Sequence, residues 1–144
     1  MTTPFYSPRT TPYSGVQPRA GLGLCAVSGT YTMLAAFLDE DVVNLVKVPK
    51  GATVLELILD VPALTDQADA TWDLGDADTT GRFISGGTAG QSSAGAIVRL
   101  TVVGSSQYAY TEDTLIQFQI KTVPGATAVT DGVIKLTVIY TMDL

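Results

Sequence analysis

The sequence of 144 residues lacks histidine altogether and contains a single cysteine, Cys25. Without histidine the chain cannot build a Ser-His-Asp or Cys-His catalytic centre, and it lacks the usual acid–base catalyst and a principal zinc ligand. One cysteine permits no internal disulfide bond, so the fold must hold without a covalent cross-link. Apolar neighbours on both sides of Cys25 predict a buried, inert thiol. These absences predict a protein that is not an enzyme and needs no cofactor.

Positive charge and long apolar runs are also scarce. Eight basic residues face fourteen acidic ones, which gives a net charge of −6, and the basic residues are scattered along the chain. Nucleic-acid binding relies on clustered lysine and arginine, so we expect no nucleic-acid partner. No apolar run approaches the roughly 18 residues of a membrane-spanning helix, and the N-terminus has no apolar signal-peptide core, so we expect no membrane association.

The first twenty residues differ in composition from the rest. They hold four of the seven prolines and no acidic residue, since the first acid in the chain is Asp39. Proline favours extended backbone, and so residues 1–20 are predicted to form an extended N-terminal arm. The arm is either a solvated tail or a segment that becomes ordered on a neighbouring subunit. The residues expected to bind a partner are its aromatic and cationic side chains, Phe5, Tyr6, Arg9, Tyr13 and Arg19.

Residues 21–144 are predicted to form one domain of strands and turns. Apolar and polar residues alternate with the period of two that is typical of a half-buried strand. This pattern is clearest in residues 96–103, 114–121 and 133–142, and further β-like stretches lie at 23–33 and 42–48. Residues 53–61 also alternate, which predicts one face made of Leu55, Leu57, Leu59 and Val61. Pro49-Lys50-Gly51 supplies a turn after residues 42–48, and Pro124-Gly125 and Asp131-Gly132 supply turns later in the chain.

One segment admits two interpretations. Leu34, Leu38, Val42 and Leu45 have helical spacing, whereas the valines from Val42 to Val48 favour a strand. The acidic run at residues 39–41 resembles a hairpin tip, so we favour strand, turn and strand over a helix here.

Six to eight short strands, each with one apolar face, must bury those faces against another sheet. The sequence therefore predicts an all-β fold, an antiparallel β-sandwich that is jelly-roll-like, with the extended arm in front. Apolar residues on the minor strand faces also predict a homo-oligomer, because a monomer would leave them exposed. They are Val54, Ile58, Ile97, Val103, Val133 and Ile139.

Residues 62–95 form a long, weakly patterned region rich in glycine and aspartate, interrupted by short strands at 71–74 and 82–85. Asp73, Asp76 and Asp78 offer oxygen ligands for a hard cation, but their spacing is not that of an EF-hand, and solvated turn residues are the simpler interpretation. The glycines of residues 86–90 are not followed by the Gly-Lys-Ser/Thr of a phosphate-binding loop.

Two further sets of side chains have the functional groups for carbohydrate chemistry or binding. Glu56 and Asp60 share a strand face about 13 Å apart, too far for a glycosidase pair, and they are expected to be polar surface residues. Trp72, Tyr108 and Tyr110 have rings that can stack on a sugar, although a lone tryptophan in a β-domain is more often core or interface.

Two stretches of the chain resemble a known family. Residues 46–54 read Val-Lys-Val-Pro-Lys-Gly-Ala-Thr-Val and precede a strand that ends in Asp60. Residues 71–76 (Thr-Trp-Asp-Leu-Gly-Asp) and 82–86 (Arg-Phe-Ile-Ser-Gly) form the second half of the pattern. Together they resemble the capsid decoration, or cement, proteins of tailed bacteriophages, which have a jelly-roll body. The resemblance covers about residues 40–90, and the C-terminal strands more loosely.

The resemblance implies a non-enzymatic virion protein on the capsid surface that binds the major capsid protein and itself, commonly as a trimer. Each copy would bridge neighbouring capsid subunits and so stabilise the lattice. Two alternatives stay open: a glycan- or receptor-binding domain of a head or tail fibre, and a cupin-like enzyme, which the missing histidine ligands disfavour.

Overall fold

The computed structural model describes residues 5–6, 23–65, 69–92, 94–102, 107–122 and 129–142. These ranges contain strands and turns only, and none of them holds a helix long and apolar enough to cross a membrane. The strands are β1 (Phe5–Tyr6), β2 (Leu24–Thr32), β3 (Val42–Val48), β4 (Ala52–Val61), β5 (Thr71–Gly75), β6 (Ile84–Gly87), β7 (Ala96–Thr101), β8 (Thr114–Thr122) and β9 (Val133–Met142). The all-β prediction is confirmed.

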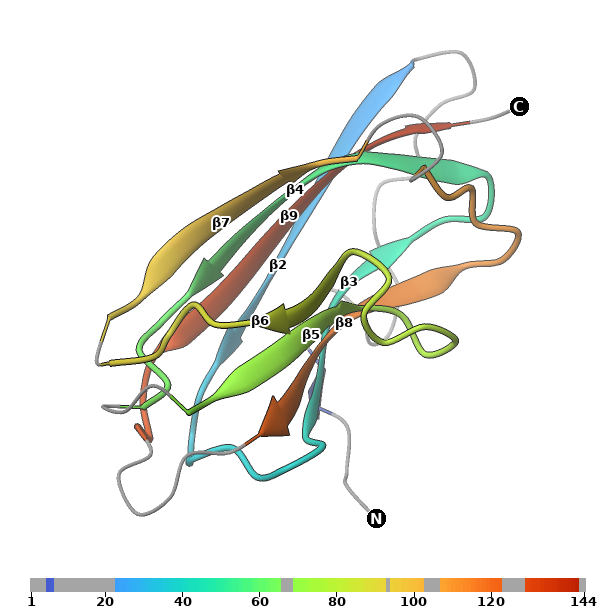
Figure 1. The fold of residues 1–144 in the computed structure, drawn as a ribbon. Helices are drawn as coiled ribbons and strands as arrows, with labels where there is room; N and C mark the ends of the chain where they lie inside the picture. The colour runs from blue at the N-terminus through green and yellow to red at the C-terminus, as the bar shows by residue number, and fades with distance from the viewer. Residues whose placement is uncertain are drawn as a thin grey trace.

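The strands form two sheets that pack face to face (Figure 1). One sheet has four strands in the order β2-β9-β4-β7, and the other has five in the order β1-β3-β8-β5-β6. Strands pair antiparallel throughout, except that β1 lies parallel to β3. Without β1 these are the two four-stranded sheets of a jelly roll, as predicted.

Most connections pass from one sheet to the other. β5 and β6 are the one pair of consecutive described strands that hydrogen-bond to each other. The turn between β3 and β4 is one of these connections between sheets. In it, Ala52 N donates a hydrogen bond to Pro49 O (3.1 Å), and the intervening Gly51 has φ +89°. This conformation suits glycine, and the turn delivers β4 to the four-stranded sheet while β3 remains in the five-stranded one.

The segment from Leu34 to Leu45 contains no helix: bends and a turn follow the end of β2, and β3 begins at Val42, so the chain from β2 to β3 is strand, turn and strand. The turn is made by Asp41, whose backbone N–H donates to Leu38 O (3.1 Å) and whose carboxylate accepts from Leu38 N (2.8 Å). The predicted hairpin tip is nevertheless wrong, because β2 and β3 belong to different sheets. A local turn motif reverses the chain without deciding which strand pairs with which.

The core lies between the sheets and follows the predicted alternation in β8 and β9. Ile116, Phe118 and Ile120 point inward from β8, and Ile134, Leu136, Val138 and Tyr140 point inward from β9. β4 departs from strict alternation because its pairing with β9 shifts register between Val54 and Glu56. The bulge inserts one extra residue, so Val54 before it and Leu57 after it both face the core although they are three residues apart.

Two expectations for β4 are corrected by this bulge. Val54, expected on the minor face, is fully buried, and Leu55, expected in the core row, is only half-buried. From Leu57 onward the predicted alternation is restored, with Leu57, Leu59 and Val61 inside.

Candidate interaction surfaces

The N-terminal arm enters the described structure at one point. Phe5 and Tyr6 form β1, paired in parallel with Val43 and Asn44 at the edge of the five-stranded sheet. The sequence predicted no strand in the arm, so this two-residue pairing is a new finding. The other partner-binding candidates, Arg9, Tyr13 and Arg19, lie outside the described residues.

The outward face of the five-stranded sheet is polar, and its side chains bond to one another. Gln117 Nε2 on β8 donates to Asn44 Oδ1 on β3 at 2.8 Å, and Asn44 is only 1% exposed. Gln119 Nε2 and Lys121 Nζ both reach the Glu40 carboxylate, at 2.9 and 3.3 Å. The turn before β3 sets Glu40 at φ +67° and so holds its side chain over β8.

The outward face of the four-stranded sheet is different in character. It exposes three large apolar side chains, Leu24 (65%), Ile97 (70%) and Val133 (47%), and Ile58 and Ile139 are half-buried on the same face. Pairs between strands fill the space between them: Arg99 Nε lies 3.1 Å from Glu56 Oε1, and Ser28 Oγ lies 2.9 Å from Thr137 Oγ1.

This arrangement largely confirms the minor-face prediction. Ile58, Ile97, Val133 and Ile139 lie outward as expected, because each has a register partner on the outer face of its neighbouring strand. Val103 lies outside the described residues.

The connection from β2 to β3 carries a second, smaller apolar feature. Leu34 is 86% exposed and Leu38 67%, while Phe37 between them is buried against Phe118. Phe37 anchors the loop to the core, so the two leucines are held at the surface by a fixed backbone.

A buried polar cluster lies where β5 leaves the five-stranded sheet. Asp76 is 2% exposed, and its carboxylate accepts hydrogen bonds from the backbone N–H of Asp78 (3.1 Å) and Thr79 (2.9 Å) and from the Tyr110 hydroxyl (2.8 Å). Arg82 completes the set with an ion pair to the same carboxylate. Every lone-pair direction of Asp76 is therefore occupied by a protein donor.

The cluster shifts two pKa values in opposite directions. Burial alone would raise the pKa of Asp76, but hydrogen bonds from Arg82, Thr79 and Tyr110 together hold it below its ordinary value. Burial and the neighbouring carboxylate raise the pKa of Tyr110 well above its usual range. Asp76 is thus charged and Tyr110 a neutral donor across the physiological range.

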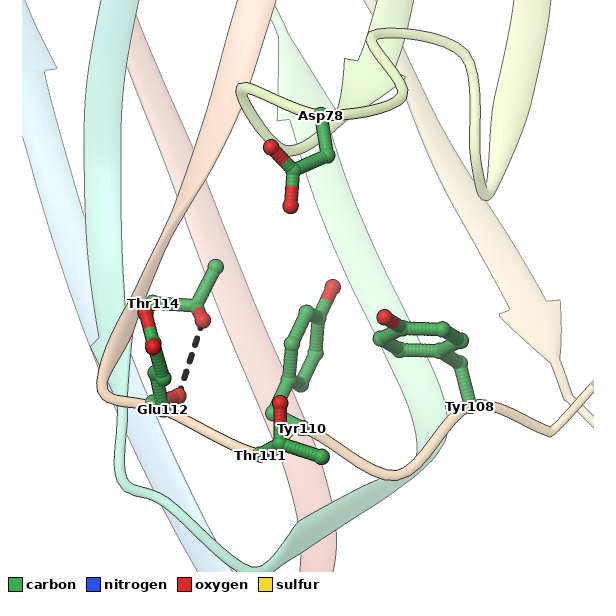
Figure 2. A pocket seen from close by; sticks show the side chains of 6 residues that line it. All are labelled: Asp78, Tyr108, Tyr110, Thr111, Glu112 and Thr114. Carbon is green, nitrogen blue, oxygen red and sulfur yellow. Dashed lines mark hydrogen bonds between the residues drawn. The ribbon is translucent and has the colours of Figure 1, made fainter.

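Tyr108 extends this cluster to the surface. The Arg82 guanidinium lies 3.7 Å from the centroid of its ring, a cation–π contact, and the rings of Tyr108 and Tyr110 meet edge to face at 4.9 Å. Beside them opens a pocket of about 200 Å³, lined by Asp78, both tyrosines and residues 111, 112 and 114 (Figure 2). Its lining is mainly hydroxyl and carboxylate groups, so it offers hydrogen bonds rather than a flat apolar platform.

The three aspartates considered as cation ligands have other partners or positions in the structure. Asp73 accepts from Gly86 N (2.9 Å) and Thr80 Oγ1 (3.3 Å), Asp76 holds Arg82 and Tyr110, and Asp78 faces the pocket. Within the part of the chain that the structure describes, no three acidic or cysteine side chains are grouped as metal ligands. The aspartates fix turns and the β5–β6 connection.

The structure also places four other candidate residues. Trp72 is 1% exposed, its ring centroid lies 5.1 Å from that of Phe118, and its Nε1 donates a hydrogen bond to Ala89 O at 2.9 Å. It is therefore a core residue and cannot stack on a sugar. Glu56 and Asp60 lie on the outward face of β4, as expected. Cys25 is half-buried rather than fully buried, because β2 is an edge strand and the sandwich covers its inward side chains less completely.

The Asp76–Arg82–Tyr110 cluster was missed by sequence reasoning, although one signal pointed to part of it. Arg82 is the single cation among residues 62–95, which hold five aspartates, so a pairing there was to be expected. Tyr110 lies 34 residues from Asp76, and only the fold brings it to the carboxylate.

Two solved capsid structures contain chains with this fold. A chain of the capsid of Ralstonia phage GP4 aligns with a TM-score of 0.72 and 19% identity, covering 99% of this chain and 99% of that one. A chain of the cyanophage Pam1 capsid asymmetric unit aligns with a TM-score of 0.69 and 24% identity, covering 89% of this chain and 92% of that one. At these identities the likeness concerns the fold.

No protein-family model matches the chain, and no curated protein matches it.

Proposed function

We propose that this chain is a structural virion protein that binds the outer surface of a phage capsid and stabilises its lattice by bridging neighbouring major capsid subunits. The observation that carries the proposal is the end-to-end likeness to a chain of a phage capsid, with 99% of both chains aligned.

The proposed division of labour follows the composition of the chain. Residues 21–144 form the body, residues 1–20 form an arm that reaches a neighbouring molecule, and copies of the chain associate, as a trimer by analogy with decoration proteins. Phe5, Tyr6 and Tyr13 supply apolar area to the arm contact, and Arg9 and Arg19 can pair with acidic groups. The four prolines reduce the conformational freedom lost on docking.

The mechanism is mechanical rather than catalytic. A rigid sandwich that contacts two capsid subunits adds buried apolar surface across their junction, and separating the subunits then requires that surface to be re-exposed. The exposed Leu34 and Leu38, held on a loop anchored by Phe37, are suited to such a contact.

The test uses particles of the parent phage assembled without this chain. Purified protein is added, and electron microscopy of the particles shows whether density for the sandwich appears at fixed sites on the capsid surface. Heating the particles with and without the protein measures stabilisation. Saturable binding with a rise in the temperature of DNA release is expected; particles that stay bare at micromolar protein contradict the proposal.

The role of the arm is tested separately with a variant lacking residues 1–20. We expect this variant to remain folded by circular dichroism but to lose saturation of the capsids. A matched variant that keeps the arm and replaces Arg9 and Arg19 with alanine measures the ionic part alone. If the truncated chain binds with unchanged affinity, the arm is only a solvated tail.

A second candidate, glycan or receptor binding by a head or tail fibre domain, is favoured by one observation, the polar pocket beside Tyr108. Burial of Trp72 removes the other candidate sugar platform. A glycan array distinguishes the two functions: specific binding that is lost in Tyr108→Ala supports the fibre domain, and a blank array leaves capsid binding.

A further inference from the structure

The outward apolar residues of the four-stranded sheet are aligned across it. Ile139 on β9 lies opposite Ala26 on β2, and the next residue on that face of β2 toward its start is Leu24. Ile139 also lies opposite Glu56 on β4, so Ile58, two residues along β4, is its diagonal neighbour.

Ile97 on β7 lies opposite Asp60, which makes it the diagonal neighbour of Ile58 in turn. Diagonal neighbours of this kind are within reach of long side chains. One continuous row, here named the diagonal stripe, therefore crosses all four strands: Leu24, Ala26, Ile139, Ile58 and Ile97.

The stripe ends at its most exposed residues. Leu24 and Ile97 are 65% and 70% exposed on the two edge strands, Ala26 is exposed, and Ile139 and Ile58 are half-buried in the middle. Folding of one copy thus leaves the ends of an apolar row in water, where a contiguous patch indicates a docking surface.

The charges beside the stripe indicate the occupant. The described outward face carries two acids, Glu56 and Asp60, and two bases, Arg99 and Lys135, so its charges cancel, although the whole chain has a net charge of −6. Arg99 pairs with Glu56, and Lys135 lies opposite Asp60 in register. When copies of one chain associate, a face with net charge would add electrostatic repulsion between them. This face has no net charge and so adds none.

The size of the face also suits association. Four strands about 4.8 Å apart and nine or so residues long present on the order of 600 Å² as a flat footprint, close to the roughly 800 Å² per partner of stable interfaces. We infer that the outward face of the four-stranded sheet, centred on the diagonal stripe, is the surface by which copies of this chain associate. The inference rests on the self-association within the proposed function and identifies its interface.

Sedimentation velocity of the full chain over a range of concentrations tests self-association through this face. No capsid is present, so the result does not depend on whether the chain binds capsids. The stripe variant is I58T/I97T, which keeps β-branched side chains and so retains strand propensity. The matched control is L34T, which removes an apolar side chain that is 86% exposed but lies off the sheet.

Wild type is expected to sediment as an oligomer at micromolar concentration, with the dissociation constant raised roughly 100-fold in I58T/I97T and unchanged in L34T. K135E makes the net charge of the face −2 and is expected to weaken association, with partial recovery in high salt. If circular dichroism shows that I58T/I97T does not fold, the single variants I97T and K135E test the interface in its place.

Three results overturn the inference: a wild type that stays monomeric, a folded stripe variant that associates as wild type does, or an L34T variant that is weakened equally. The first also removes self-association from the proposed function. The second and third leave self-association in place and move it to another surface.

Discussion

Polar side chains bond to one another on the outward faces of both sheets, but of the two described faces it is the four-stranded one that also exposes large apolar side chains. On the five-stranded sheet, polar groups bond to one another: Gln117 to Asn44, and Gln119 and Lys121 to Glu40. On the four-stranded sheet, exposed apolar residues lie opposite polar ones: Leu24 pairs in register with Thr141, and Ile97 with Asp60. The polar groups named on the first face bond within the chain, apart from the buried Gln119 Oε1, which has no partner among the described residues. The second face leaves apolar area in water.

This difference indicates where substitutions should be felt. Changing a side chain whose partners are in the same chain lowers the free energy of unfolding, since the partner loses its hydrogen bond. Changing an exposed apolar side chain barely alters folding but alters association. Stability and oligomeric state are therefore expected to map onto different faces of the sandwich.

The largest effect is expected at the end of β5. Asp76→Asn removes the charge that holds Arg82 and weakens the acceptor of the Tyr110 hydroxyl, so the free energy of unfolding should fall by about 3 kcal/mol, as when a buried ion pair is broken. Urea denaturation measures it. Asp78→Asn, on the exposed rim of the nearby pocket, is the control and should change stability by less than about 0.5 kcal/mol.

The same cluster predicts a pH dependence. The pKa of Asp76 is held below its ordinary value of 3.8, so the stabilisation it provides is complete above about that pH and is lost as the pH falls through the lowered pKa. The pKa of Tyr110 is raised above 10, so its contribution is lost as the pH rises beyond 10.

Denaturation curves across pH measure both limits. Wild type should lose stability more steeply in acid than Asp76→Asn does, and more steeply in alkali than Tyr110→Phe does. Parallel curves for wild type and Asp76→Asn below pH 4 would show that ionisation of this carboxylate is not coupled to folding.

A smaller loss is expected on the outward face of the five-stranded sheet. Gln117→Leu leaves the buried Asn44 side chain without the donor that it now bonds at 2.8 Å, which should cost about 1–2 kcal/mol. Thermal unfolding followed by circular dichroism reports it. The partner change Asn44→Leu combined with Gln117→Leu should recover part of the loss, and no recovery in the pair contradicts the assigned bond.

The smallest effect on folding is expected on the four-stranded sheet. Val133→Thr changes a side chain that is 47% exposed, so the free energy of unfolding of the separated chain should move by less than about 0.5 kcal/mol. Thermal unfolding at a concentration below the association range checks this. A loss as large as that in Gln117→Leu would erase the distinction between the two faces.

The sequence predicted much of the fold where patterning is local. Strict alternation in β8 and β9 identified their inward residues, and turn residues at Pro49–Gly51 placed a chain reversal correctly. Patterning failed at Val54, where a bulge changes the face without any change in composition. It also failed to predict which strands pair, because turns such as Leu38–Asp41 connect strands of different sheets.

The candidate site shows the same division. The outward position of Ile58 and Ile97 followed from alternation alone. Their alignment into one row did not, because it depends on the registers β9–β4 and β4–β7. The union of Asp76 with Tyr110 depends likewise on two loops from different parts of the chain.

What the sequence by itself determined is the class of the fold and the kinds of chemistry excluded: alternation with a period of two requires sheets with one buried face, and a chain without histidine lacks the common catalytic and zinc-binding side chain. The tertiary structure alone decided which surfaces exist. Non-local strand pairing sets the neighbours of each outward side chain, and those neighbours determine whether a polar group is satisfied within the chain or an apolar group is left for a partner.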